Sequence, residues 1–291
     1  MTQLASSQST SSQPVIDRRA SRVRRVPSLF VAHGSPMSVL DKDFAGAVHR
    51  FTSRQLRLRA IVVVSAHWQA PGAIRVTSNP KPSLIYDFMG FPGWLYEIAY
   101  PCPGDRAVAQ MVAVMLERSG IEARLDPDRG LDHGVWVPLS LAFPEAAVPV
   151  IQVSLPLPST PDLMLAMGRA LAPLRSEHVL LVGSGGIVHN LARLQMDEDG
   201  PIPEPWAAEF DTWVREKVAV LDTGALLTYP RLAPHAGAAV PTSEHFDPLL
   251  FTVGTALPGD TVHEIYDGFR YGTLSMRTFA LTGRRREDRG F

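Results

Sequence analysis

A run of four β-branched residues, Ile61–Val64, constrains the fold more than any other stretch of this chain. Continued by Ser65 and Ala66, it predicts a strand that is buried on both faces, as in parallel sheets covered by helices. The strand would end at His67 and Trp68. In open α/β sheets, ligands bind in the crevice beyond the carboxyl ends of the strands. The stretch therefore predicts an α/β fold with a histidine at the functional edge of its sheet.

A second stretch has the same build. Residues 27–32 form a short apolar run that stops at His33 and Gly34. Two parallel strands that each end in a histidine bring both imidazoles to the same edge of a sheet. Imidazole nitrogens bind zinc, iron, copper and nickel. We therefore expect His33 and His67 to be two ligands of a metal site, and any of these four metals would fit.

The remaining apolar segments alternate between strand and helix patterns. Short β-branched runs predict strands, and apolar residues at intervals of three and four predict amphipathic helices. Such alternation is typical of α/β folds with largely parallel sheets. The expected strands are residues 73–77, 149–154 and 178–183, and the expected helices are residues 41–51, 107–119, 162–174, 205–221 and 242–253.

No shift in composition of the kind seen in linkers divides residues 26–291, so we expect one domain there. Residues 1–25 are rich in serine and glutamine and then basic, and they lack the apolar segment of a secretory signal. We predict that they form a disordered tail. The basic run Arg284–Arg286 is expected to be a solvated end of the chain.

Two further segments depart from simple alternation. Residues 80–103 form a long irregular stretch that is rich in aromatic side chains, which favours an ordered, functional loop. Its aromatic side chains either form one wall of a pocket or only pack beneath the loop. Residues 261–281 alternate between polar and apolar and contain Gly268 and Gly272. This pattern predicts strands near a sheet edge, with a bulge or a turn.

Composition limits the partners and the compartment. The formal net charge of -1 gives no reason to expect nucleic acid or an acidic membrane surface as a partner. Cys102 is the sole cysteine, which excludes an internal disulfide framework and fits a reducing cytoplasm. No apolar run approaches the ~20 residues that span a bilayer. We expect a cytoplasmic protein, and the sequence is compatible with a homo-oligomer.

Five of the nine histidines share one context, next to a glycine, proline, serine, asparagine or helix cap just beyond a predicted element. They are His33, His67, His133, His189 and His245. By contrast, His49, His178 and His263 lie within a helix or near the start of a strand, and we assign them no role.

The position of His245 in its predicted helix gives its direction. Leu249 and Val253 follow it at intervals of four residues, so His245 should lie on the inward, apolar face. The adjacent Glu244 should then point elsewhere, and we predict that it is not a ligand.

The glycines at 183, 185 and 186 allow two interpretations, the first of which is a loop that cradles a phosphate. Their spacing matches neither a P-loop nor a dinucleotide fingerprint, which favours a tight strand-to-helix turn.

Six segments recur in this order in one known family. They are His33–Met37, Ser65–Trp68, Tyr86–Pro92, Leu131–Gly134, Gly183–Asn190 and Pro241–Phe246. On these motifs the chain resembles the class III extradiol ring-cleavage dioxygenases, in the branch typified by DOPA 4,5-dioxygenase, from about Ser28 to the C-terminus. Gly186 departs from the family pattern, in which asparagine is frequent, and we expect a local change of the turn there.

The resemblance implies a fold and a site. The family fold is a single three-layer α/β/α domain with a central mixed sheet. His33, His67 and His245 match the metal ligands, and His189 matches either a fourth ligand or the acid/base group. His133 matches a histidine that lines the pocket and serves in catalysis. The implied cofactor is one divalent metal ion per chain, with Fe(II) expected for activity and Zn(II) able to occupy the same site.

The implied reaction inserts both atoms of O2 into a small aromatic diol and opens the ring. Two other classes stay open at this point. A zinc hydrolase would use the same ligands, with zinc lowering the pKa of bound water, but the chain has no H-E-x-x-H motif. A non-catalytic interaction module on the same fold would tolerate loss of the histidines, yet all of the family histidines are present.

Overall fold

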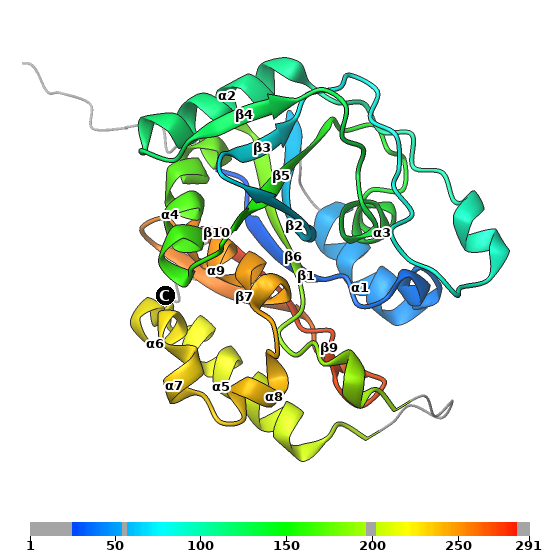
Figure 1. Cartoon of the computed structure of the whole chain (residues 1–291), viewed down its shortest axis with the longest axis vertical. Coiled ribbons are helices and arrows are strands. Elements are labelled where there is room, and N and C mark those ends of the chain that lie inside the picture. Colours follow the sequence, from blue (N-terminus) through cyan, green and yellow to red (C-terminus); the bar gives the residue numbers. More distant parts are fainter. Residues whose placement is uncertain (1–24, 54–56, 196–201, 284–291) are drawn as a thin grey trace, which may run out of the picture.

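The computed structural model describes residues 25–53, 57–195 and 202–283. Its centre is an eight-stranded sheet with the order β4-β3-β5-β2-β6-β1-β10-β7 (Figure 1). The strands are β1 (Ser28–Ala32), β2 (Ala60–Pro71), β3 (Ile74–Thr77), β4 (Ala123–Asp126), β5 (Val150–Leu157), β6 (Val179–Gly185), β7 (Asp260–Tyr266) and β10 (Thr278–Gly283).

The sheet is mixed, with a parallel centre. Strands β5, β2, β6 and β1 pair in parallel, as do β3 and β4. By contrast, β10 pairs with β1 and with β7 antiparallel, and one antiparallel bridge joins β3 to β5. The predicted mixed, largely parallel sheet is therefore confirmed.

Helices cover both faces of the sheet, as the run of β-branched residues in β2 requires. On one face Val62 and Val64 pack with α2 (Arg106–Arg118), α4 (Pro161–Leu171), α5 (Pro205–Ala219) and α9 (Asp247–Gly254). On the other face Ile61 and Val63 pack with α1 (Lys42–Ser53) and α3 (His133–Ala142). Successive side chains of a strand point to opposite faces, so β2 contributes side chains to the hydrophobic cores on both sides of the sheet. The fold is thus a three-layer α/β/α arrangement (Figure 1).

The smaller elements complete the chain order. The helices are α6 (Thr223–Leu227), α7 (Tyr229–Leu232) and α8 (Ala236–Ala239), and strands β8 (Phe269–Arg270) and β9 (Leu274–Ser275) form a separate two-stranded sheet. The 3-10 turns are η1 (Pro36–Leu40), η2 (Gly93–Glu97), η3 (Ala172–Glu177), η4 (Leu191–Arg193) and η5 (Ser243–His245).

Most predicted elements are present, and the differences have physical reasons. Helix α3 was not predicted, because its sequence is apolar on every side and carries Pro138. Strand β2 is longer than predicted and runs to Pro71. Its pairing with β5 shifts between Val64 and Gln69, so His67 lies at an irregularity inside the strand and not beyond its end. The edge strand β7 and the bulge between Thr278 and Phe279 agree with the pattern of residues 261–281.

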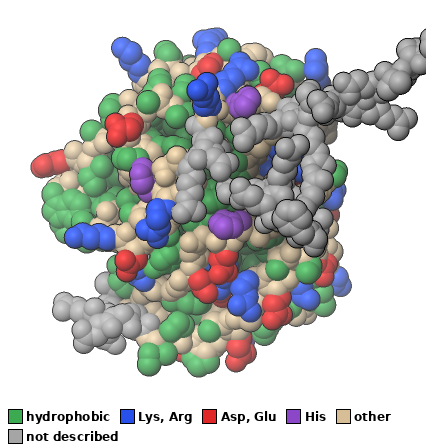
Figure 2. Space-filling model, turned by 180° about the vertical axis from the view of Figure 1, so that it is seen from behind, with side chains coloured by type: hydrophobic (Ala, Val, Ile, Leu, Met, Phe, Trp, Pro, Cys, Tyr) green, Lys and Arg blue, Asp and Glu red, His purple; other side chains and the backbone are tan. Residues whose placement is uncertain are grey.

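Three expectations concern the ends and the surface. The expected tail lies outside the described residues except for Arg25, which donates to the Pro258 carbonyl at 2.7 Å and pairs with Asp260. Arg284–Arg286 also lies outside them. No described helix is long and apolar enough to cross a bilayer. Figure 2 shows acidic and basic side chains interspersed on the back of the molecule.

Candidate metal centre

Three histidines from distant parts of the chain meet at one edge of the sheet. One ring nitrogen each of His33, His67 and His245 lies within 4.8 Å of the others. The Nε2 atoms of His33 and His67 are 3.1 Å apart. The ring of His245 has its centroid 5.3 Å from that of His33 and 5.0 Å from that of His67. The structure therefore assembles the three histidines that the sequence predicted as metal ligands.

Sheet register brings these residues together. Strand β6 lies between β1 and β2, with Ala32 beside Gly185 and Ser65 beside Ser184. His33 follows β1 directly, and its backbone N–H donates to the Gly185 carbonyl at 3.2 Å. The two histidine-bearing segments are thus held at the same level of the sheet by their common neighbour.

The glycines of β6 serve close packing. A Cβ on Gly185 would lie 2.1 Å from the His245 carbonyl oxygen, and a Cβ on Gly183 would lie equally close to the Pro248 carbonyl oxygen. The Gly186 N–H donates to the His245 carbonyl at 2.8 Å. The predicted strand-to-helix turn is therefore wrong for Gly183 and Gly185, because both lie within β6 and let η5 and the first turn of α9 approach the sheet. Only glycine permits backbone contact at this distance.

Hydrogen bonds fix which nitrogen of each ring is free. The Ser184 hydroxyl donates to the Gly134 carbonyl, so its oxygen accepts from His33 Nδ1 at 2.9 Å. Likewise His245 Nδ1 donates to a Glu244 carboxylate oxygen at 3.1 Å. Both rings thus carry their proton on Nδ1 and leave the Nε2 lone pair available. His245 Nε2 is buried and has no hydrogen-bond partner among the described residues, as expected for an atom reserved for a metal.

Electrostatics keep the rings of His33 and His67 neutral. Burial, reinforced by the neighbouring histidines, holds the pKa of His33 well below its ordinary value and lowers the pKa of His67 to about 2. Only neutral imidazole binds a metal, so these two rings are ready for a cation at neutral pH. Three nitrogen donors on one side of an ion leave further coordination positions open. The three residues fit one transition-metal ion.

His189 lies against the ring of His245. The two rings stack with centroids 3.4 Å apart and planes inclined by 6°. His189 contributes no atom to the group of three nitrogens among the described residues. Burial and the adjacent His245 lower its pKa to about 3, so it is a neutral imidazole that can accept a proton. This placement favours the acid/base role over that of a fourth ligand.

His133 begins α3 and lies beside the cluster. Its ring centroid is 4.0 Å from that of His67 and 5.7 Å from that of His33. The Asp87 carboxylate accepts from both the Nδ1 and the backbone N–H of His133, each at 2.9 Å. Burial raises the pKa of Asp87, but the hydrogen bond from His133 outweighs it and brings that pKa to about 2. One nitrogen or oxygen each of His67, Asp87 and His133 also lies within 4.8 Å of the others.

Glu244 is oriented differently from the prediction. Its carboxylate accepts from His245 Nδ1 and from the Thr242 hydroxyl, which lies 2.8 Å away. Thr242 therefore does not cap a helix, and His245 ends a 3-10 turn ahead of α9. The hydrogen bond from His245 lowers the pKa of Glu244 to about 2. Glu244 thus orients His245, one of the predicted ligands, and its carboxylate does not belong to the group of three nitrogens.

Comparison with known proteins agrees with this geometry. Residues 26–277 match the family model of the catalytic LigB subunit of aromatic ring-opening dioxygenase. The chain belongs to this family. It is 37% identical over 259 residues to the 4,5-DOPA dioxygenase extradiol of Escherichia coli K12, covering 87% of this chain and 93% of that protein. The protein of the same name from Portulaca grandiflora is 35% identical, covering 88% of this chain and 95% of that protein.

A solved structure shares the fold. The crystal structure of an uncharacterized protein from Escherichia coli K12 superposes with a TM-score of 0.75 at 32% identity, covering 88% of this chain and 99% of that one. Membership of the family makes this chain an oxidoreductase of the ring-cleaving dioxygenase class.

Aromatic side chains of the 80–103 loop flank the histidines of this dioxygenase. Phe88 meets the His133 ring edge-on, with centroids 5.6 Å apart, and Tyr86 and Tyr96 pack behind it. The loop lies on the same side of the sheet as α3 (Figure 1). An aromatic side of this kind suits a flat aromatic ligand.

A buried polar network supports the His67 segment from behind. The Ser65 hydroxyl donates to Asp132 at 2.8 Å and accepts from the His67 N–H at 3.2 Å. The side-chain amide of Gln152 also donates to Asp132. Burial raises the pKa of Asp132. Asp132 and Asp87 both lie in the motifs that carry the family resemblance, but no pattern around them predicts a role for either.

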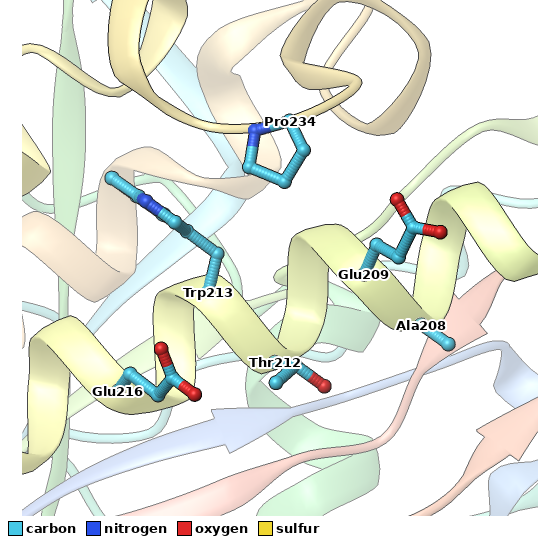
Figure 3. A pocket seen from close by; sticks show the side chains of 6 residues that line it. All are labelled: Ala208, Glu209, Thr212, Trp213, Glu216 and Pro234. Carbon is cyan, nitrogen blue, oxygen red and sulfur yellow. The ribbon is translucent and has the colours of Figure 1, made fainter.

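Hollows elsewhere on the surface contain none of these histidines. One of about 420 Å³ lies on α5 and is lined by Trp213, Glu209, Glu216 and Pro234, among others (Figure 3). Another of about 450 Å³ lies between α5 and strands β7 and β10. Neither hollow is lined by a histidine of the cluster, so we assign the chemistry to the cluster.

Proposed function

We propose that the protein is an extradiol dioxygenase that acts on a DOPA-like or other substituted catechol. It would insert both atoms of O2 and open the ring beside one hydroxyl, giving a muconic semialdehyde. The observation that carries the proposal is the convergence of His33, His67 and His245, whose ring nitrogens lie within 4.8 Å of one another, with Nδ1 of both His33 and His245 engaged in hydrogen bonds. The expected ion is Fe(II), one per chain, and Zn(II) could occupy the same site.

The residues divide the work. His33, His67 and His245 would hold the metal, which supplies the electronic link between a bound catecholate and O2. His189 would accept a proton from the catechol and return it later, as a neutral imidazole can. The aromatic side chain of Phe88 would lie beside the substrate ring. Both oxygen atoms enter the product and all the electrons come from the substrate, so the reaction needs no external reductant.

The wider assignment rests on the same observations. We infer that residues 26–291 form one catalytic domain, since the sheet and the family match cover most of that range. A small aromatic diol and O2 would be its partners, and we infer a cytoplasmic location from the single, buried Cys102. A homo-oligomer would be compatible with this assignment.

Metal reconstitution tests the proposal. Zinc has no accessible redox change, so the zinc-loaded protein should bind a catechol without consuming O2. Anaerobic loading with Fe(II) should restore catechol-dependent O2 uptake and release of a coloured semialdehyde. Equal O2 uptake by the zinc and iron forms would rule out the proposed mechanism. Hydrolysis of an ester by the zinc form, without O2 uptake by the iron form, would point to a hydrolase.

A further inference from the structure

Asp87 is the one carboxylate in the described residues that touches two histidines of the site from the loop side. Its Oδ1 accepts two hydrogen bonds from His133, and its Oδ2 lies 3.6 Å from Nδ1 of His67. The second distance is too long for a hydrogen bond, so the carboxylate acts on His67 through its charge alone. The Asp87 side chain is 24% exposed, and its backbone belongs to the irregular 80–103 loop.

This part of the loop is held firmly. The Ile85 N–H donates to the Leu131 carbonyl at 2.7 Å, and the Leu131 N–H donates to the Ser83 carbonyl at 2.8 Å. The Trp136 indole N–H donates to the Ile85 carbonyl at 3.1 Å. These bonds attach the residues just before Asp87 to the start of α3. A side chain presented from a fixed backbone can hold a catalytic group in one geometry.

We propose that Asp87 is a positioning residue that sets the tautomer and the orientation of His133. Because an ionised carboxylate only accepts hydrogen bonds, the ring nitrogen that faces it must carry the proton. In its neutral form His133 therefore has its proton on Nδ1 and an acceptor lone pair on Nε2, which can receive a hydrogen bond from a hydroxyl of a bound diol. This inference rests on the proposed function for the role of His133 toward substrate.

The same carboxylate also favours an Nδ1–H on His67, whose Nε2 faces His33. A single residue of the loop thus arranges one proposed ligand and one proposed catalytic histidine. The strong hydrogen bonds go to His133, whereas His67 already has its place in β2. Loss of Asp87 should consequently disturb His133 more than the metal.

Asp87→Asn is the test, because it keeps the shape of the side chain and removes its charge. The asparagine amide can turn its NH2 toward His133, which would favour the opposite tautomer. In the iron-loaded protein we expect kcat to fall about 10–100-fold, as for other partners of active-site histidines. We expect the metal content to stay unchanged. Asp87→Glu should restore part of kcat because it restores the carboxylate.

Two measurements separate positioning from folding and from the proposed function. Nitrogen-15 spectra of histidine-labelled zinc protein report each tautomer without any turnover, and His133→Gln identifies the resonances of His133. They should show Nδ1–H in the unchanged protein and a shifted tautomer in Asp87→Asn. Glu97→Gln, an exposed carboxylate change on the same loop, is the matched control and should alter neither the spectra nor kcat.

Three results decide the matter. An unchanged His133 tautomer in a folded Asp87→Asn protein would overturn the inference. Loss of the metal from Asp87→Asn would also overturn it, since Asp87 would then be a ligand with His67 and His133. A shifted tautomer in a protein that never consumes O2 with a catechol would support the positioning role, while it would refute the proposed function.

Discussion

The two sides of the site are built in different ways. The sheet side consists of His33, His67 and His245, which are held by parallel strands and by close backbone contacts at the glycines of β6. The loop side consists of Asp87, Phe88 and His133, which are held by hydrogen bonds between an irregular segment and the start of α3. The sheet side is suited to hold an ion, and the loop side is suited to receive and orient an aromatic substrate.

The largest effect should follow from changes on the sheet side. Replacing any one of His33, His67 or His245 with alanine removes one of three donors to a metal, so we expect the bound metal to fall from one per chain to nearly none. Catechol-dependent O2 uptake should disappear with it. Metal analysis after dialysis measures the first effect directly. Full occupancy in two of these three variants would refute the ligand assignment.

The difference between the sides also explains what the sequence could reveal. His33 and His67 follow runs of buried residues, and those local patterns specify both the strand and the edge at which it ends. Asp87 lies in a segment without a periodic pattern, and its partner His133 is 46 residues away. A contact between such segments depends on how the loop folds back onto α3. The sequence pattern predicted the sheet side and a functional loop at residues 80–103, whereas the contact between Asp87 and His133 emerged from the structure.

Glu244 is a second residue whose contacts the sequence pattern did not predict. The predicted helix phase turned His245 inward correctly, and His245 is buried together with Leu249 and Val253. The phase failed for Glu244 because residues 243–245 form a 3-10 turn, which places neighbouring side chains differently from an α-helix. Its carboxylate could therefore reach the ring of the next residue.

The second largest effect should come from His189, which lies next to the sheet side without belonging to its group of three nitrogens. Acid/base groups usually contribute ~10²–10⁴-fold to rate. We expect His189→Ala to retain its metal and its binding of catechol, while turnover falls by a factor in this range. Metal analysis and steady-state O2 uptake on the same preparation check both statements. Release of the metal would make His189 a fourth ligand and would leave His133 as the acid/base group.

An intermediate effect is expected for Glu244, which supports the sheet side from outside. Partners that orient a metal-bound histidine typically contribute 10–100-fold to metal affinity or activity. Glu244→Gln should therefore weaken metal binding by about 10–100-fold, as measured by competition with a chelator, and still reach full occupancy at high metal concentration. His245→Gln should remain empty under the same conditions. The reverse pattern would make Glu244 the ligand.

The smallest effect concerns how the free energy of unfolding depends on pH. This dependence should differ between His67 on the sheet side and Asp87 on the loop side. Burial lowers the pKa of His67 in the folded protein to about 2. Below about pH 6.5 His67 is therefore protonated in the unfolded chain and stays neutral in the folded chain. The metal-free protein should therefore lose stability as the pH falls below about 6.5, by up to about 1.4 kcal/mol per pH unit for each such histidine. His67→Gln should make this decline shallower by that amount. His49→Gln, which removes an exposed histidine from α1, shows what the loss of a histidine does by itself.

Asp87 on the loop side should act in a different pH range. Its pKa is lowered to about 2, so its contribution to stability is complete above pH 4 and is lost only as the pH falls toward 2. Between pH 7 and 5, urea unfolding of metal-free Asp87→Asn should keep the full decline that His67→Gln reduces. Asp87→Asn could instead flatten the decline in stability in this range as much as His67→Gln does. In that case Asp87 and His67 would titrate as a coupled pair, and the two sides would not be electrostatically separate.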